Sequence, residues 1–542
     1  MACSVRFPVT FALALSLFAH PASATDDHLL LCEVAVSPTA GEFLEIVNPT
    51  STTRTLAGVY VSDDQDYALL AGESGAGPPP TIATSDFIAA FPAGASVAPC
   101  GVVVVALDGI GFFATYGFRA DFEIRATDPA TPDMTATIVG ASAGLTDAGE
   151  SAVLFFWDGA NDLVADLDMV NVGTPTADNA IGDKTGVAVD GPDPDTTASS
   201  YLPDIHSMPL QLGDPGSGES TKRLLLEGTS EATGGGNGVT GDDETSEDIL
   251  VTWDSSFIAA DPGSCPLPPT CYYAGVDPTD AATLRATLHA RIDRHDRLAW
   301  GESVWQLLEA ADEDPVDSDS ILDLYRNATY PKDRIDYQRE HAWPSSFGFP
   351  NEGDPPYTDC HMLFLADGDY NLARSNHPYR SCTAPACQEY ATLSNHGQGG
   401  PPPPRENSNW ETGVQHNGSW ETWLGRRGDV ARAVFYMDVR YEGDTGEPDL
   451  ILTDNPALIQ PTGPGATEGY MGLLSTLIAW HLQDPVDDLE RIRNGVVYHR
   501  QRNRNPFIDH PEWADCVFSA FCPIFADGFE TGNTSRWSGT VP

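Results

Sequence analysis

The sequence predicts a multidomain protein in which an all-β sandwich is followed by a mostly helical α+β domain. The chain has 542 residues, which is too long for one ordinary hydrophobic core. From Leu29 to Ser264, short β-branched and aromatic runs are separated by clusters of Gly, Pro, Asp and Ser, as in a sandwich of short strands. After residue 272, apolar residues recur at helical spacing. We therefore expect a β domain at 25–264, a linker at 265–271 and the helical domain at 272–522.

The first 24 residues have the pattern of a secretory signal peptide. Arg6 supplies a positive charge, Pro8 to Phe18 form an apolar stretch, and Ala22-Ser23-Ala24 is typical of a cleavage site. The apolar stretch is too short to span a bilayer, and no later segment is long and apolar enough. We expect an exported protein without a transmembrane segment, located outside the cell, in the periplasm or at the cell surface.

The cysteines are also typical of an exported protein. Removal of Cys3 with the signal peptide leaves nine, without any paired CxxC unit, which favours disulfides over a zinc site. The pairs that we expect are Cys32 with Cys100, Cys382 with Cys387, and Cys516 with Cys522. Cys265, Cys271 and Cys360 are then left over, and an odd total means that at least one thiol is free or paired outside the chain.

The net charge of −51 would normally argue against a polyanionic partner. The basic residues are unevenly placed, however, because twenty of the twenty-five arginines follow residue 271. Arginine can hold phosphate through two parallel hydrogen bonds. The alternative is an acidic secreted protein whose arginines only pair with its own carboxylates.

The runs of the first domain follow one another in an order that resembles a lamin-tail domain, an immunoglobulin-like sandwich. They include LLLCEVAVS, GEFLEIVNPT, FPAGASVAPCGVVVVA and AGESAVLFFWDG. This region shows no cluster of titratable residues with metal or nucleophile spacing. The resemblance implies a binding module whose partner, a surface or another protein, is unknown.

Five segments of the second domain have the apolar spacing of helices. They are Ala282–Asp293, Val304–Asp314, Val430–Tyr441, Gly472–Leu482 and residues 484–500, where Asp484-Pro485 predicts the helix start. The last 20 residues, 523–542, show no core-forming pattern and are similar to short tails of exported bacterial proteins.

The strongest chemical signal lies between Gln338 and Arg374. QREHAWP contains Glu340 and His341, and DCHMLFLADGDYNLAR contains Asn371. Two strands followed by a helix would bring these side chains together. Carboxylate and amide oxygens suit a hard divalent cation, and an imidazole can take a proton from water near neutral pH. An adjacent acid and histidine also occur by chance, so the pair alone decides nothing.

Five ordered motifs over roughly residues 272–515 resemble the endonuclease I family of ββα-metal (His-Me finger) nucleases. They are ILDLYRNATYPK, REHAWPSSFG, TDCHMLFLADGDYNLARSNHPY, GDVARAVFYMDVRY and RNGVVYHRQRNRNPFIDHPEW. The resemblance implies His341 as general base, and Glu340 and Asn371 as ligands of one Mg²⁺ or another divalent cation such as Ca²⁺ or Mn²⁺. The implied substrate is nucleic acid, cut with low sequence specificity; DNA is expected, and RNA stays open.

One feature departs from the pattern of some relatives. They carry an arginine for the leaving phosphate before the DCHML-like strand, whereas Phe347–Thr358 contains no basic residue. We expect Arg374 to fill this catalytic role, with Arg380 as a second candidate; Arg374 could equally be a packing and salt-bridge residue.

Further residues are candidates for supporting the site or binding substrate. Asp359 and His361 are expected to fix the hairpin, whereas Arg502, Asn503 and Asn505 could contact phosphates. Asn505 could instead hold loop backbone. A rival function is a surface-attached binding or adhesion protein with an inactive nuclease domain; the intact Glu340, His341 and Asn371 argue against it.

Overall fold

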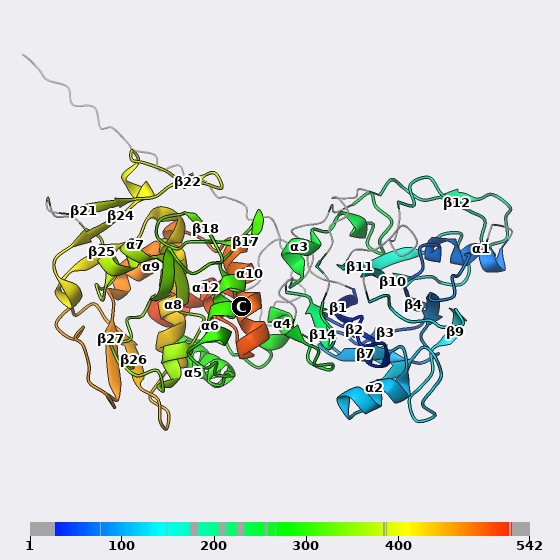
Figure 1. The fold of residues 1–542 in the computed structure, drawn as a ribbon, viewed down its shortest axis with the longest axis horizontal. Helices are drawn as coiled ribbons and strands as arrows, with labels where there is room; N and C mark the ends of the chain where they lie inside the picture. The colour runs from blue at the N-terminus through cyan, green and yellow to red at the C-terminus, as the bar shows by residue number, and fades with distance from the viewer. Residues whose placement is uncertain are drawn as a thin grey trace, which may run out of the picture.

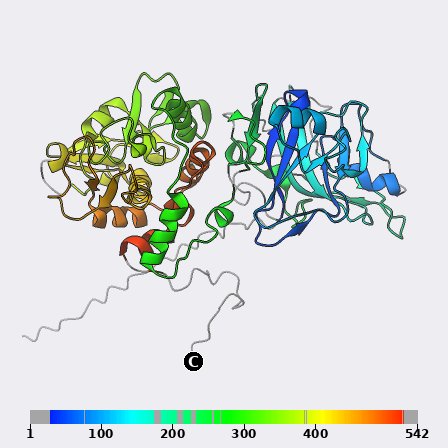
Figure 2. The same ribbon diagram turned by 90° about the horizontal axis from the view of Figure 1, so that it is seen from below.

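The computed structural model describes residues 28–522, with gaps at the following positions: 76, 78, 148, 174–182, 205–211, 214, 225–231, 233, 255–257, 266, 383–384, 386 and 520–521. The predicted signal peptide and C-terminal tail lie outside the described residues. The chain forms a strand-rich lobe from its N-terminal half and a helix-rich lobe from its C-terminal half (Figures 1 and 2). This division agrees with the predicted order of a β region followed by a region of helices and strands.

The N-terminal lobe is built on two mainly antiparallel sheets. The first has the order β15-β14-β1-β2-β7-β8, with bounds Ile258–Ala259, Glu219–Lys222, Leu30–Ala35, Phe43–Val47, Val102–Ala106 and Phe122–Glu123. The second has the order β11-β10-β4-β5-β9, with bounds Ala165–Gly173, Gly149–Phe156, Val59–Ser62, Phe87–Ala90 and Thr135–Val139. Alternate residues of both sheets, among them Ile46 and Val103 from the first and Val61 and Leu154 from the second, share one buried core. The two sheets therefore pack on each other through their apolar faces.

Smaller elements surround these sheets. They are β3 (Arg54–Thr55) paired with β6 (Ser96–Val97), β12 (Ala188–Val189) paired with β13 (Ser199–Ser200), α1 (Leu70–Ser74), α2 (Gly109–Tyr116) and α3 (Ile249–Thr252).

The C-terminal lobe is organised around α8 (Arg427–Arg440), whose fourteen residues are all buried. The other helices are α4 (Pro269–Tyr272), α5 (Ala281–Ile292), α6 (Glu302–Ala311), α7 (Gly368–Arg374), α9 (Leu474–Gln483), α10 (Asp488–Gln501), α11 (Pro506–Asp509) and α12 (Glu512–Ser519). All five helices predicted from periodicity are confirmed. The last of them begins at Asp488, not near Asp484, because the Asp487 side chain accepts a hydrogen bond from the Glu490 amide and caps the first turn.

The strands of this lobe form small separate sheets. The sets are β16 (Glu313–Asp314), β17 (Asp317–Leu322) and β18 (Thr329–Pro331); β19 (Tyr337–His341) and β20 (Leu363–Asp367); β21 (Gln388–Ala391), β24 (Ser408–Thr412) and β25 (Ser419–Glu421); β22 (Ser394–Asn395) and β23 (Gln398–Gly399); β26 (Asp449–Leu452) and β27 (Glu468–Met471). The β19–β20 hairpin packs against α6 and α7. In the described part of the chain, no helix is long and apolar enough to cross a membrane.

The disulfides correct one predicted pair. Cys382–Cys387 and Cys516–Cys522 are confirmed, but Cys32 pairs with Cys265 and Cys100 with Cys271. The predicted Cys32–Cys100 bond is wrong because both cysteines of the linker between the lobes reach back to the first sheet. Cys360 is the free cysteine among the described residues and is fully buried.

The lobes also meet through the chain that follows β14. Leu224 belongs to the hydrophobic core of the helical lobe, and the carbonyl of Arg223 lies 3.2 Å from Nε2 of His499 on α10. A side chain at Gly495 would approach the Leu224 carbonyl oxygen to 3.0 Å, so glycine permits this close approach of backbone to helix.

Candidate active site

The Glu340–His341 pair occupies the end of β19 in the hairpin with β20. Glu340 lies opposite Phe364 and His341 lies opposite Leu363. Because successive side chains on a strand point to opposite faces, the acid and the imidazole are turned away from each other. Each therefore has its own surroundings.

Glu340 points to the protein interior and is 3% exposed. Its Oε1 accepts a hydrogen bond from the Tyr325 hydroxyl at 2.8 Å and lies 3.2 Å from Nη1 of Arg374. The Tyr325 hydroxyl also lies 3.0 Å from that of Tyr379. Burial raises the pKa of Glu340 above its ordinary value, while Arg374 and Tyr325 act in the opposite direction. Both partners meet Oε1, so Oε2 is the carboxylate oxygen left for another ligand.

His341 lies on the other face within an aromatic group. Its Nε2 is 3.0 Å from the carbonyl oxygen of Tyr357. A carbonyl only accepts, so Nε2 carries the hydrogen and Nδ1 the lone pair. Within the described residues, Nδ1 makes no hydrogen bond. Burial lowers the pKa of His341 to about 4, so the ring is neutral at neutral pH and its Nδ1 lone pair can accept a proton.

Trp300 completes this face of the strand. Its ring stacks on the His341 ring at a centroid distance of 5.5 Å and meets the Tyr357 ring edge-on at 4.9 Å. The guanidinium carbon of Arg339 lies 3.3 Å from the centre of the Trp300 ring. The imidazole is thus held between its hydrogen bond to Tyr357 and the indole.

Asn371 comes from α7, directly after β20. The helix starts there because the Asp367 carboxylate accepts hydrogen bonds from the amides of Asp369 and Tyr370. Nδ2 of Asn371 donates to the carbonyl of Arg339 at 3.4 Å. The amide therefore reaches the backbone immediately before Glu340, and its oxygen stays available.

These donors fit a hard divalent cation. The available atoms are Oε2 of Glu340 and Oδ1 of Asn371, both oxygens, and Mg²⁺ is commonly bound by one or two protein oxygens with water completing its shell. A cation beside Glu340 would also favour the ionised carboxylate that burial disfavours.

Arg374 lies under the site rather than on its surface. It is 1% exposed, and its guanidinium donates to the carbonyls of His341 and Ala342 besides pairing with Glu340. Of its two suggested roles, these contacts favour packing and salt-bridge formation. Arg380 is half-buried; its guanidinium donates to the Asn417 carbonyl at 3.4 Å.

Asp359, His361 and Asn503 form a separate, fully buried cluster. Asp359 accepts hydrogen bonds from the hydroxyls of Tyr436 and Tyr441 at 2.8 and 2.9 Å. Nε2 of His361 lies 2.8 Å from the Asn503 carbonyl. Asp359, His361 and Asn503 are each at most 2% exposed. They can therefore support the hairpin but cannot contact a polymer.

Arg502 and Asn505 also lie apart from Glu340 and His341. Arg502 ends α10 in the left-handed conformation and pairs with Asp261 of the N-terminal lobe. Asn505 is 1% exposed and caps α11 by accepting from the Phe507 amide. These contacts favour the alternative role of Asn505, which is to hold loop backbone.

Three residues at the site were not singled out from the sequence: Tyr325, Trp300 and Tyr357. Tyr325 lies within the ILDLYRNATYPK motif, which could have suggested it. Trp300 and Tyr357 carry no local pattern, since their role depends on loops that only the folded chain brings against β19.

The hairpin, the following helix, the buried acid and the imidazole carry the residues of the nuclease motifs, and sequence comparison identifies a nuclease, an enzyme that hydrolyses phosphodiesters. Residues 280–512 match the family model described as Endonuclease I. The chain belongs to the endonuclease I family, as its motifs predicted.

Two relatives are both named "Extracellular ribonuclease". That of Bacillus subtilis (strain 168) is 40% identical over 254 residues, covering 46% of this chain and 78% of the relative. That of Bacillus amyloliquefaciens is 38% identical over 253 residues, with the same coverage. A solved DUF4876 family protein from Bacteroides thetaiotaomicron is 14% identical, covering 44% of this chain and 69% of its own, with a TM-score of 0.23, a level that supports no inference.

Proposed function

We propose that the protein is an exported, metal-dependent endonuclease of low sequence specificity that cuts DNA and RNA. The observation that carries this proposal is the hydrogen bond between Nε2 of His341 and the Tyr357 carbonyl. It leaves Nδ1 as a base on the hairpin that also carries Glu340, with Asn371 reaching the adjacent backbone.

In the proposed reaction, Nδ1 of His341 takes a proton from a water molecule as the water oxygen bonds to phosphorus. The bond from phosphorus to the 3′-oxygen breaks, and the departing oxygen receives a proton from solvent. The Tyr357 carbonyl, accepting from Nε2, stabilises the imidazolium that forms. Glu340 and Asn371 would hold Mg²⁺, or Ca²⁺ or Mn²⁺, which when bound supplies positive charge for the phosphate oxygens.

Arg374 serves this site as a positioning residue. By donating to the carbonyls of His341 and Ala342 and pairing with Glu340, it fixes the strand end that presents both groups. The residue that stabilises the leaving group is then a more exposed cation, and Arg380 is the candidate.

The polymer preference and the location are supported by the relatives. Both relatives are named as extracellular ribonucleases, which supports RNA as a substrate beside DNA and a location outside the cell. Four disulfides and the expected signal peptide support export. For the N-terminal lobe, we retain a lamin-tail-like module that binds a surface or a protein partner.

A cutting assay with plasmid DNA and with structured RNA tests the proposal. The wild-type chain should cut both polymers with Mg²⁺ and stop on chelation, and His341→Ala should be nearly inactive. His396→Ala is the matched control, because the His396 side chain, 23% exposed, pairs with Asp314 in another part of the lobe. Equal cutting by the wild type and His341→Ala would refute the mechanism. An inactive wild type would favour the rival, a binding or adhesion protein with an inactive nuclease domain.

A further inference from the structure

A second group of metal-ligating side chains lies at the junction of α5 and the loop between α8 and β26. His289 and Asp293 are four residues apart at the C-terminal end of α5, so they lie on one face, and Asp444 approaches from the loop. One ligand atom from each lies within 4.8 Å of the other two. None of the three contacts Glu340 or His341 in the described structure.

The tautomer of His289 is fixed from outside the group. Its Nδ1 lies 2.9 Å from the carbonyl oxygen of Val439, which can only accept, so Nδ1 carries the hydrogen. The other nitrogen, Nε2, lies 3.2 Å from Oδ2 of Asp444. In a neutral imidazole, Nε2 would direct a lone pair at a carboxylate oxygen. This contact is favourable only if a cation, either a proton or a metal ion, lies between the two atoms.

The third member favours the metal ion over the proton. A proton on Nε2 satisfies Asp444 alone, whereas Asp293 places a second carboxylate oxygen within 4.8 Å of both partners. Ligands at about 2.0–2.1 Å from a tetrahedral Zn²⁺ are separated by roughly 3.3 Å, close to the 3.2 Å between Nε2 and Oδ2. We propose that His289, Asp293 and Asp444 form a binding site for a divalent transition cation of the Zn²⁺ type, whose remaining position water fills.

The neighbouring charges are compatible with a cation. Arg440 lies 3.4 Å from Asp293 but also pairs with Glu447 at 2.8 Å. Glu442 lies 4.0 Å from Nδ1 of His289 and pairs with Arg285. Arg440 and Arg285 each have a carboxylate of their own besides the proposed ligands. Arg294 also lines the pocket beside Asp293, but the carboxylates of Asp293, Asp444, Glu442 and Glu447 outnumber these three arginines. The mixture of imidazole and carboxylate suits Zn²⁺ better than Mg²⁺, which takes oxygen ligands.

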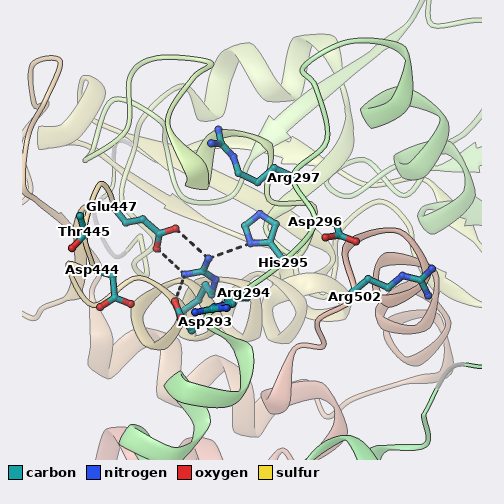
Figure 3. A pocket seen from close by; sticks show the side chains of 10 residues that line it. Asp293, Arg294, His295, Asp296, Arg297, Asp444, Thr445, Glu447 and Arg502 are labelled. Atoms are coloured by element: carbon teal, nitrogen blue, oxygen red, sulfur yellow. Dashed lines mark hydrogen bonds and ion pairs between the residues drawn. The ribbon is translucent and has the colours of Figure 1, made fainter. Parts of the chain in front are cut away.

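The proposed ligands can be reached from solvent. Asp293 and Asp444 both line an open pocket of about 870 Å³, and Figure 3 shows them on the same side of it, near Thr445 and Glu447. The Asp444 side chain is 52% exposed. A bound ion would join the end of α5 to the 443–447 loop and fix that wall of the pocket.

Zinc titration of the full chain, first stripped with a chelator, tests the site. Calorimetry with Zn²⁺ alone and native mass spectrometry give its affinity and stoichiometry. Asp444→Asn removes an exposed ligand with little effect on packing, and His289→Ala removes the imidazole. His396→Ala is the matched control: its Nε2 lies 3.0 Å from Asp314, a similar pair that belongs to no three-residue group among the described residues. Glu340→Gln is included because its loss of zinc would show that the ion binds at the candidate active site instead.

We expect one zinc ion whose affinity falls at least tenfold in Asp444→Asn and in His289→Ala. The same ion should remain in His396→Ala and in Glu340→Gln, whatever their nuclease activity. The proposal is overturned if the wild type and Asp444→Asn bind the same number of ions with the same affinity. It is also overturned if only Glu340→Gln loses zinc, because the ion would then occupy the other site. Failure of the nuclease proposal would leave this titration unchanged.

Discussion

His341 and His361 belong to the same hairpin unit and have the same local chemistry, but they differ in exposure to solvent. In both His341 and His361, Nε2 lies against a backbone carbonyl, and burial lowers both pKa values to about 4. His361 is 2% exposed and its Nδ1 is buried without a partner, whereas His341 is half-buried and its Nδ1 is not enclosed in this way. A perturbed pKa therefore does not identify a base; access for water does.

The largest expected effect is on the cutting rate, which should depend on His341 and not on His361. His341→Ala should lower the cutting rate by about 10²–10⁴-fold, the usual contribution of a general base, with a small change in stability. His361→Asn should destabilise the fold but leave the rate per folded molecule within a few fold. Rates normalised to the folded fraction measure both. Comparable losses of normalised rate in the two variants would mean that His341 and His361 do not differ as base and structural residue.

The next effect concerns the arginine beneath Glu340. Arg374→Met should lower the free energy of unfolding by about 3–5 kcal/mol, because it leaves a buried carboxylate unpaired. Urea unfolding measures this change. As a control, Arg491→Met breaks the exposed pair with Asp488 and should cost less than about 1 kcal/mol. A stable Arg374→Met that is inactive would instead indicate direct catalysis by Arg374.

A smaller effect is expected in the buried cluster. Asp359→Asn should cost about 1–3 kcal/mol of unfolding free energy, because it weakens the bonds from the two tyrosine hydroxyls. Burial alone would raise the pKa of Asp359, but His295, His361 and the hydrogen bonds from Gln501 and Tyr436 hold it below its ordinary value. The carboxylate therefore stabilises the fold above the unfolded pKa of about 3.9, and this contribution is lost as pH falls through the folded pKa. Unfolding at pH 7 and near pH 3 should show the difference from wild type shrinking with acidity.

The smallest effect tests how His341 is held. With a pKa of about 4, the wild-type rate should stay level from neutral pH to about pH 5 and fall below that. Trp300→Ala should admit water, raise this pKa toward its ordinary value and move the acid limb to higher pH, with about a tenfold loss of rate. Trp300→Phe should restore most of the profile. An unshifted limb in Trp300→Ala would mean that the indole only packs.

Local patterns were sufficient for the helices of the C-terminal lobe and for the family, whereas the roles of Glu340, His341 and Asn371 stay predictions. Apolar periodicity predicted α5, α6, α8, α9 and α10, and the resemblance of the motifs predicted the family. The Cys32–Cys100 pair failed because disulfide partners depend on how the linker returns to the first sheet. The placement of Arg374 could not be foreseen either, since an arginine in a motif looks the same whether it faces phosphate or backbone carbonyls.

The sequence by itself determined the order of a β region and a helical region, the helices, and the motifs of this nuclease family. It did so because these properties depend on neighbours along the chain. The tertiary structure alone decided which histidine water can reach, which arginine is buried and which cysteines pair. It also decided that His289, Asp293 and Asp444 meet, because Asp444 is brought to α5 by packing across more than a hundred residues of chain.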